Sequence, residues 1–220
     1  MTSGMRASDE ARAVAPDVVL RPATPDDCRR IAELFRVASD GVADYIWSRL
    51  QPEHPGALLV EIGTRRYQRE NTAFSYQTVW SPSTGRRHRH DARLRDRAGR
   101  RARARRETDP VLRPYAELEL PGSLYISAIA VVPRYRGQGI GTRFLAAARE
   151  RARREGCPAL SLICLDQNEG AKRLYERAGC TILDRRDVVP HRLIHATGTA
   201  LLMSSPVEPE PASGTGAGDI

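Results

Sequence analysis

The feature that most constrains the fold of this chain is an apolar strand that runs into a glycine-rich turn. Residues 124–131 (LYISAIAV) are apolar almost without interruption, which is typical of a strand buried on both faces of a sheet. The turn carries three glycines within 137–141 and leads into a helix expected over 141–154. Since the first N–H groups of a helix lack partners and the helix dipole adds positive potential, such a turn can bind a pyrophosphate. The pattern predicts an α/β fold with an anion site at this turn.

Two other kinds of phosphate-binding turn fit the sequence less well. A P-loop ends in Gly-Lys-Ser/Thr, but the only lysine of the chain is Lys172, far from the turn. A dinucleotide-binding fingerprint has its glycines directly after the strand, whereas here residues 133–136 intervene and Thr142 stands at the last glycine position. Asp166, at the end of a later strand, keeps the dinucleotide alternative open. Nucleoside triphosphate chemistry is not favoured.

Hydrophobic periodicity predicts further elements on both sides of the turn. Thr24 is the expected cap of a first helix, whose apolar positions recur at helical spacing. The other expected elements are helices over 42–50, 57–69 and 169–177 and strands over 18–21, 72–80, 159–165, 181–189 and 196–203, the last two forming a hairpin. We expect one domain over residues 17–203, with disordered ends at 1–16 and 204–220.

The positive charge of the chain is concentrated in one segment. The formal net charge is +8, yet residues 86–106 alone hold eleven arginines against two acids, which leaves the other 199 residues at −1. That segment has no aromatic residue on which a nucleic acid base could stack. The composition therefore argues against a nucleic acid partner for the fold itself, and any such claim concerns the arginine-rich segment alone.

Cysteine usage and the absence of targeting patterns predict a cytoplasmic protein. The four cysteines lack CxxC spacing and lie within apolar patterns, which favours buried structural thiols in a reducing compartment. The first sixteen residues have neither the apolar stretch of a secretory signal nor the pattern of a transit peptide. The longest apolar run is only long enough for a strand, so we expect no membrane span.

Two segments of the chain resemble motifs of the GNAT superfamily of N-acetyltransferases. Residues 136–141 (RGQGIG) look like its Gln/Arg-x-x-Gly-x-Gly/Ala motif, and residues 159–165 with 168–179 are similar to its second motif, a strand followed by a helix with Asn and Tyr. The two motifs stand in the right order and at the right separation. The resemblance implies a mixed, mostly antiparallel central sheet flanked by helices and splayed between 124–131 and 159–165, with acetyl-CoA bound in the splay.

The resemblance also implies roles for individual residues. Backbone groups of 129–131 would pair with the pantetheine arm like an added strand, and residues 137–142 would hold the pyrophosphate. The residues so assigned to the cofactor are Ile129, Ala130, Val131, Arg136, Gly137, Gln138, Gly139, Ile140, Gly141, Thr142 and Asn168. Tyr175 would donate a proton to the departing coenzyme A thiolate. Core packing for Tyr175 and helix capping for Asn168 are the alternatives, and capping is compatible with cofactor binding.

A general base is not evident in the sequence. Members of the family often carry a carboxylate on a central strand, but residues 124–131 have none and Ile163 stands where the next strand could supply one. The open candidates are Tyr125, Ser127, Glu117, Glu119, His191 and His195. Tyr45 and Trp47 are candidates for a wall of the acceptor site, with core packing as the alternative.

Residues 82–107 do not fit the pattern of the family. The strand expected over 72–80 needs a hairpin partner, yet residues 86–106 show no apolar alternation. Three accounts are open: a solvated insertion, an arginine-rich arm for nucleic acid or an acidic partner, and a stretch translated out of frame. We favour the last as a hypothesis, because the codons CGT-CAT-CGG-CAT-GAC for residues 87–91 read Val-Ile-Gly-Met one base later; resequencing the gene tests it.

The sequence as a whole predicts an acyltransferase that moves an acetyl group from acetyl-CoA, as co-substrate, directly to an amine. The one cysteine within these motifs, Cys164, lies in an apolar strand pattern and is not expected to act as a nucleophile. No His/Cys/Asp cluster has metal-ligand spacing, so neither a covalent intermediate nor a metal is expected. The acceptor would be a small-molecule or peptide amine, and a homodimer is compatible with this interpretation. The alternative is a catalytically impaired coenzyme A-binding module or an arginine-rich nucleic-acid adaptor.

Overall fold

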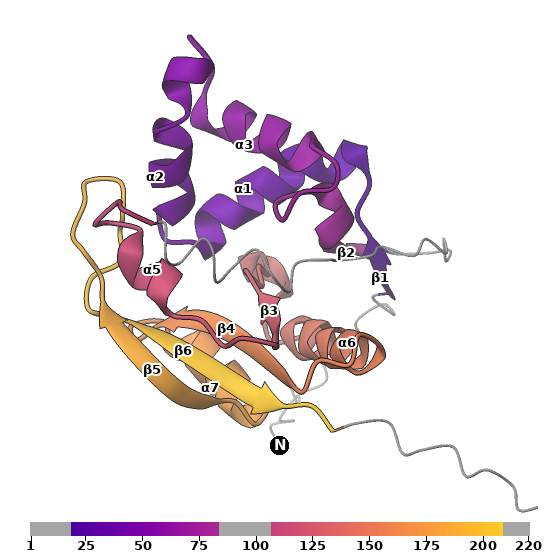
Figure 1. Ribbon diagram of the computed structural model, residues 1–220. Coiled ribbons are helices and arrows are strands. Elements are labelled where there is room, and N and C mark those ends of the chain that lie inside the picture. The colour runs from indigo at the N-terminus through magenta and orange to yellow at the C-terminus, as the bar shows by residue number, and fades with distance from the viewer. Residues whose placement is uncertain (1–18, 84–106, 209–220) are drawn as a thin grey trace, which may run out of the picture.

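The computed structural model describes residues 19–83 and 107–208, and these form a helical layer above a sheet layer (Figure 1). The first part of the chain holds β1 (Val19–Pro22), α1 (Cys28–Ala38), α2 (Val42–Ser48), α3 (Leu59–Gln68) and β2 (Trp80–Ser83), with 3-10 turns at Pro25–Asp27, Gln51–Glu53 and Tyr76–Thr78. The second part holds α5 (Arg113–Glu117), β3 (Leu124–Ile126), a 3-10 turn at Pro133–Tyr135, α6 (Ile140–Arg154), β4 (Ala159–Leu165), α7 (Glu169–Arg177), β5 (Thr181–Asp187) and β6 (Thr199–Pro206).

The helical layer has a core of its own. The predicted helix start at Thr24 is confirmed, since its backbone N–H donates to Asp27 Oδ2 at 2.8 Å ahead of α1. Trp47 of α2 is 1% exposed, with its ring 6.4 Å from that of Phe35. A Cβ atom at Gly63 of α3 would stand only 2.5 Å from the Trp47 ring, so glycine is what lets α3 approach α2 this closely.

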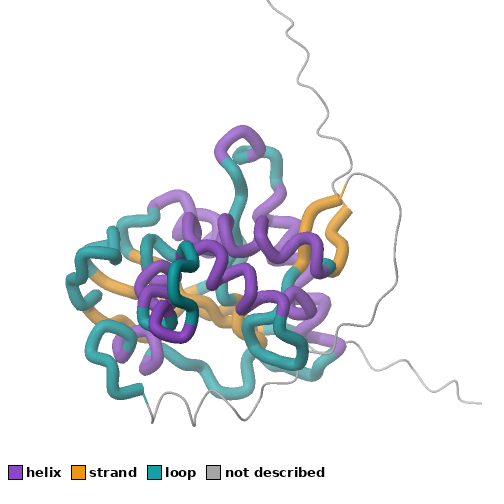
Figure 2. Tube along the Cα trace, turned by 90° about the horizontal axis from the view of Figure 1, so that it is seen from above, coloured by secondary structure: helices purple, strands orange, loops and turns teal. Residues whose placement is uncertain are grey.

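The strands form two separate sheets within the described residues. β1 pairs antiparallel with β2, and the larger sheet has the order β3-β4-β6-β5, with β3 and β4 parallel and the other pairs antiparallel. Viewed from above, the β1–β2 pair lies at one edge, apart from the strands of the larger sheet (Figure 2). The expected mixed, mostly antiparallel sheet flanked by helices is confirmed, including the closing β5–β6 hairpin.

Alternation along β4 explains how the larger sheet is covered. Leu160, Leu162 and Cys164 face the side on which α6 and α7 pack, whereas Ile163 and Leu165 belong to the cluster formed with α5 and its flanks. The prediction that the cysteines are structural is confirmed, because all four are free and buried. Residues of both faces are thus apolar, and β4 is the buried centre of this layer.

Two predicted strands are wrong in extent. Residues 72–79 form turns instead of a strand, because side chains satisfy the local backbone: Ser75 Oγ accepts from the Gln77 N–H at 3.2 Å, and Thr78 Oγ1 donates to the Ser75 carbonyl at 2.8 Å. The strand expected over 124–131 is regular only at Leu124–Ile126, and its residues are half-buried and exposed instead of buried on both faces. Its apolar character beyond Ile126 has another cause, described with the site below.

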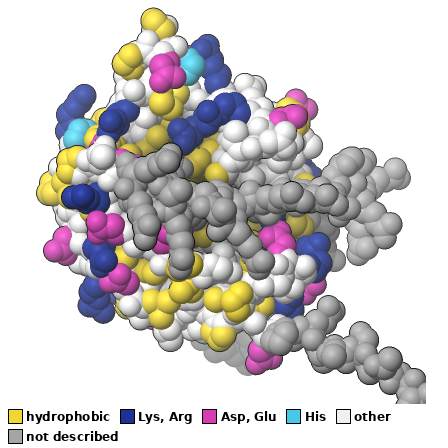
Figure 3. Space-filling view, viewed as in Figure 1, with side chains coloured by type: hydrophobic (Ala, Val, Ile, Leu, Met, Phe, Trp, Pro, Cys, Tyr) yellow, Lys and Arg dark blue, Asp and Glu magenta, His cyan; other side chains and the backbone are white. Residues whose placement is uncertain are grey.

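Several predictions fall on residues that the structure does not describe. The disordered N-terminus expected at 1–16 and the accounts of the arginine-rich residues 86–106 lie outside the described ranges. The tail expected to be disordered over 204–220 is wrong at its start, because β6 continues to Pro206 in antiparallel pairing with β4, and Ser204 and Ser205 are buried there. The rest of that expected tail, residues 209–220, lies outside the described ranges. On the face seen in Figure 3, positive and negative side chains are interspersed over the described surface. None of the helices within residues 19–83 and 107–208 has the length and apolarity that a membrane crossing requires.

Candidate functional site

The glycine-rich turn is fixed to the segment before it by short hydrogen bonds. The N–H groups of Tyr135 and Arg136 donate to the carbonyls of Val132 and Pro133 at 2.9 and 3.0 Å. The Arg136 side chain then reaches back, its Nε donating to the Val131 carbonyl at 3.1 Å. Arg136 therefore ties the turn to residues 127–132, and it occupies the carbonyl of a residue predicted to pair with pantetheine.

The glycines of the turn serve two different purposes. Gly137 and Gly139 have φ of +76° and +75°, and a Cβ atom at either would meet nothing within 4 Å. They supply a left-handed backbone that side chains disfavour, in open space just ahead of α6, with Gly139 as its N-cap. At Gly141, by contrast, a Cβ atom would stand 2.7 Å from Leu174 Cδ2, so this glycine permits close contact between α6 and α7.

A large cavity opens where β3 and β4 part. Their parallel pairing ends at Ile126 opposite Leu162, while β4 continues to Leu165. Residues 127–133 and 163–165 line the two sides of a cavity of about 1210 Å³. The apolar character of 127–132 thus belongs to a cavity wall rather than to a strand covered on both faces, which explains why the sequence overpredicted the strand.

The cavity gathers most of the residues predicted for the cofactor. The predicted residues that line it are Ile129, Ala130, Val131, Arg136, Gly137, Gly139, Ile140, Gly141, Thr142, Asn168 and Tyr175. Gln138 is not among them, and its side-chain amide donates to the Arg134 carbonyl at 3.2 Å, which closes the turn from outside. The structure thus brings the two predicted motifs to one space.

Asn168 and Tyr175 lie on the α7 side of this cavity. Asn168 is the N-cap of α7, its Oδ1 accepting from the Ala171 N–H at 3.1 Å, so the capping alternative is correct. A carboxamide also has two N–H donors, and a role toward a cofactor would use these. Tyr175 is 7% exposed, and burial raises the pKa of its phenol, with Cys164 and Cys180 adding to the effect.

The predicted base and wall candidates separate into two groups. Tyr125, Ser127 and Glu119 line the cavity. The others do not: Glu117 pairs with Arg186 at 3.0 Å on the surface, His191 and His195 lie in the β5–β6 connection, and Tyr45 and Trp47 pack within the layers. Core packing is therefore the role of Trp47, and Tyr45 has the structural partner described next.

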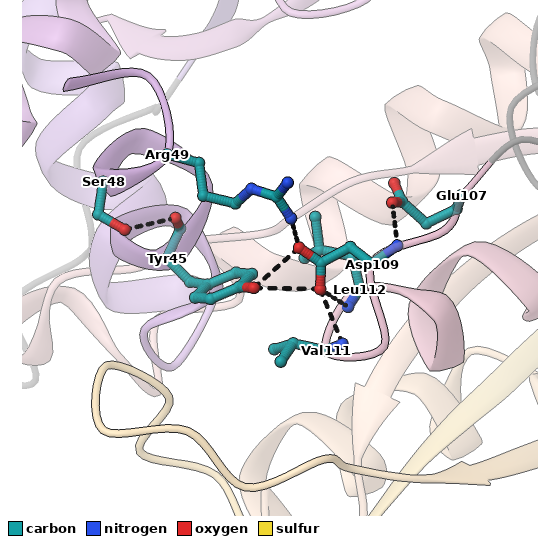
Figure 4. A network of polar contacts seen from close by, with 7 residues as sticks. All are labelled: Tyr45, Ser48, Arg49, Glu107, Asp109, Val111 and Leu112. Atoms are coloured by element: carbon teal, nitrogen blue, oxygen red, sulfur yellow. Dashed lines mark hydrogen bonds and ion pairs between the residues drawn. The ribbon is translucent and has the colours of Figure 1, made fainter. Parts of the chain in front are cut away.

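The wall opposite the cofactor motifs comes from α1, the α1–α2 connection and α5, and a buried carboxylate fixes α5 to α2. Asp109, 6% exposed, accepts from the Tyr45 hydroxyl at 2.8 and 3.0 Å and forms an ion pair with Arg49 (Figure 4). Its Oδ1 also accepts from the Val111 N–H at 2.8 Å. Residues more than sixty positions apart are thereby held as one wall.

Sequence reasoning missed two residues of this wall, Asp40 and Tyr115. Both line the cavity, Asp40 from the α1–α2 connection and Tyr115 from α5. Burial raises the pKa of the Asp40 carboxyl, against the opposing effect of His195, and raises the pKa of Tyr115 to about 12. The signal that could have found Asp40 is its place before Gly41 at a helix break, where Asp tolerates the left-handed conformation.

Comparisons with known proteins agree with this architecture. The model of the acetyltransferase (GNAT) family matches residues 70–180, half of the chain. A solved acetyltransferase structure covers 86% of this chain and all of its own with a TM-score of 0.56 and 19% identity, which is a likeness of fold. The thialysine N-epsilon-acetyltransferase of Mus musculus is 42% identical over 57 residues, which are 26% of this chain and 34% of that protein.

A second curated relative gives the same picture. An acetyltransferase of Agrobacterium fabrum is 42% identical over 60 residues, 27% of this chain and 42% of that protein. The matched regions thus cover only about a third to two fifths of the length of these relatives. The family match over half the chain, together with the fold, is sufficient for assignment: the chain belongs to the acetyltransferase (GNAT) family.

Proposed function

We propose that this protein is an acetyl-CoA-dependent N-acetyltransferase that transfers the acetyl group directly to an amine. The observation that carries the proposal is the single cavity that joins the start of α6, the segment 127–132, Asn168 and Tyr175. Family membership supports acetyl-CoA as the acyl donor. The relatives named for acetylation of thialysine support an amine as the acceptor.

The residues present fit acetyl-CoA at one end of the cavity. The first turn of α6 offers N–H groups to a pyrophosphate, and the open space at Gly137 and Gly139 leaves room for it. Beyond Ile126 the backbone has left the ladder with β4, which supports the proposal that groups of 129–131 pair with an extended pantetheine arm. The Val131 carbonyl is already bonded to Arg136, so that pairing would use other groups of the segment.

Tyr175 suits the role of proton donor to the leaving thiolate. Its raised pKa keeps the phenol protonated at neutral pH, and it lies in the same cavity as Cys164 of β4. Burial raises the pKa of the Cys164 thiol to about 11. A thiolate formed in these surroundings therefore takes up a proton more strongly than one in water. Since burial raises the pKa of both groups, the phenol stays protonated until a thiolate forms, and that thiolate then takes up the proton.

Acetyl-CoA titration and a Tyr175→Phe variant test the proposal together. We expect calorimetric titration to give micromolar binding to the wild type, and Tyr175→Phe to bind acetyl-CoA alike while kcat for thiol release with amines falls by about 10²-fold or more. Tyr76→Phe is the matched control, because its hydroxyl bonds Glu70 on the exposed surface outside the cavity. A folded wild type without acetyl-CoA binding would contradict the cofactor assignment, and unchanged turnover in Tyr175→Phe would remove its role as the acid.

The cellular setting follows from the same proposal. Acetyl-CoA as donor and four buried cysteines without a disulfide are consistent with a cytoplasmic enzyme acting on a small-molecule or peptide amine. A homodimer is compatible with this function, and size-exclusion chromatography with light scattering measures it.

A further inference from the structure

The end of the cavity opposite the glycine-rich turn contains a carboxylate and a phenol that the proposed cofactor does not use. Asp40 lies between α1 and α2, and Tyr115 lies on α5. Both line the cavity that also holds Tyr175. Apolar side chains of α2 and the α5 region line the same cavity: Val42, Ile46, Leu112 and Leu118.

Asp40 is held firmly by its backbone. Its φ of +46° lies in the left-handed region, and its carbonyl accepts from the His195 N–H at 2.9 Å. The next residue, Gly41, lies so close to the β5–β6 connection that a Cβ atom would overlap the Leu193 carbonyl oxygen. The position of the Asp40 side chain at the cavity is therefore set by two neighbouring backbone contacts.

Tyr115 has a buried hydroxyl that finds no hydrogen-bond partner among the described residues. Such a group is costly to leave unsatisfied, which points to a partner supplied by a ligand. The charge of Asp40 raises the pKa of Tyr115, after burial as the larger cause, and adds in the same direction to that of Cys164 on β4. Asp40 therefore acts on groups from two other elements of the cavity.

Two of the other three carboxylates that line the cavity already have partners, and the third, Glu119, lies in the segment between α5 and β3. Glu33 pairs with Arg29 and Arg30 at 3.4 and 3.1 Å. Glu107 accepts from the Asp109 N–H at 3.1 Å. Within the described residues Asp40 has no ion pair, so a cation entering this end of the cavity would find its carboxylate available.

We propose that Asp40 and Tyr115 bind the acceptor, that this acceptor is a cationic primary amine with an apolar body and no carboxylate beside its nitrogen, and that Asp40 takes its proton. The inference rests on the proposed function and names its substrate class. The unpaired carboxylate of Asp40 selects an ammonium group, and the apolar wall selects the apolar body of the acceptor. An acceptor with its own carboxylate next to the nitrogen would be repelled by Asp40.

The transfer balances without a further reactant. One of the three ammonium protons passes to Asp40 and then to solvent, the neutral nitrogen attacks the thioester carbonyl, and a C–N bond forms as the C–S bond breaks. The thiolate takes a proton from Tyr175, and the phenol recovers one from the reacting nitrogen. The third proton stays on the amide product, and the net yield is amide, coenzyme A thiol and one proton.

Tyramine and tyrosine test the inference, since they differ only by the carboxylate beside the nitrogen. We expect wild-type kcat/KM for tyramine to exceed that for tyrosine by about 100-fold. Asp40→Asn should lower kcat/KM for tyramine by about 100-fold, with the acetyl-CoA Kd unchanged. Asparagine also tolerates the left-handed backbone, so the variant should fold. Asp26→Asn is the matched control, because Asp26 is exposed and lies outside the cavity.

Tyr115→Phe gives an independent arm if Asp40→Asn fails to fold. It should lower kcat/KM for tyramine by about 10-fold at unchanged acetyl-CoA affinity, because only the hydroxyl contact to the amine is lost. Wild-type turnover in both folded variants, or equal use of tyramine and tyrosine, would overturn the inference. A wild type that binds acetyl-CoA but acetylates neither amine would overturn it too, whereas failure to bind acetyl-CoA at all is failure of the proposed function.

Discussion

The two ends of the cavity are built in different ways. The end proposed for the cofactor comes from one stretch of the chain, from Ser127 through α7, and relies mostly on backbone: a helix start, a strand edge and glycines. The end proposed for the acceptor comes from α1, the α1–α2 connection and α5, which lie far apart in the chain and are joined by side-chain contacts. Local sequence therefore determines the first end, and tertiary contacts determine the second.

This difference predicts that the two ends can be damaged separately. Loss of a contact that holds the helical layer together should impair acceptor use more than acetyl-CoA binding, because the cofactor motifs pack on the sheet through α6 and α7. Damage at the α6–α7 contact should do the reverse. Asp109→Asn and Gly141→Ala compare the two ends directly, and Gly41→Ala and Asp27→Asn measure how firmly the helical layer is held. The largest expected effect comes first.

Gly41→Ala should have the largest effect. A Cβ atom there would overlap the Leu193 carbonyl oxygen, and the φ of +92° adds strain, so we expect a loss of about 3 kcal/mol or more in the free energy of unfolding. Urea unfolding measures it. Gly56→Ala is the control, since its φ is +77° but nothing lies within 4 Å of a Cβ atom, and it should cost about 1 kcal/mol. Equal losses in the two variants would show that the contact with Leu193 does not matter.

Asp109→Asn should be the next most damaging change. The carboxylate is buried and bonded to Tyr45 and paired with Arg49, so removing its charge should cost about 3 kcal/mol. Tyr45→Phe removes one neutral donor and should cost about 1 kcal/mol. Thermal unfolding of both variants and of the double variant gives the coupling energy, and purely additive losses would contradict a shared network. Amine turnover should fall more than acetyl-CoA affinity.

The sequence was informative where structure depends on local chemistry. The strand over 159–165, the helix over 169–177 and the glycine-rich turn were predicted within a residue of their observed bounds, because their caps and glycines act on neighbouring backbone. The strand expected over 72–80 failed because Ser75 and Thr78 bond the backbone locally. The sequence around Asp40 indicates a helix break at Gly41, but it does not indicate that α5 and β4 line the same cavity as Asp40.

Gly141→Ala should cost less stability than Asp109→Asn, and it should impair acetyl-CoA binding instead of amine use. The new methyl group would meet Leu174 Cδ2 at 2.7 Å, at the flexible tip of a side chain, so the cost should be about 1 to 2 kcal/mol. We expect weaker acetyl-CoA binding by calorimetry, because α6 must shift from α7, with the amine KM unchanged. Leu174→Ala in the same chain should restore part of the affinity by making room. No recovery in the double variant would mean that the contact with Leu174 is not the cause.

The smallest expected effect concerns acid stability at the start of α1. Arg21 bonds Asp27 at 2.7 and 2.9 Å, and this bond, followed by the Thr24 contacts, lowers the pKa of Asp27 to about 2. A lowered pKa means stability that is present above pH 4, the range of a free carboxyl, and is lost as pH falls through 2. Because the pair is partly exposed, we expect it to contribute about 1 kcal/mol to the free energy of unfolding.

Many other carboxylates also titrate in this pH range, so the wild type alone is not informative. The quantity to measure is the difference in the free energy of unfolding by urea between wild type and Asp27→Asn, from pH 4.5 to 2. The difference should shrink toward the acid end, since protonation makes the wild type resemble the variant. A constant difference would mean that Asp27 contributes packing or capping rather than charge.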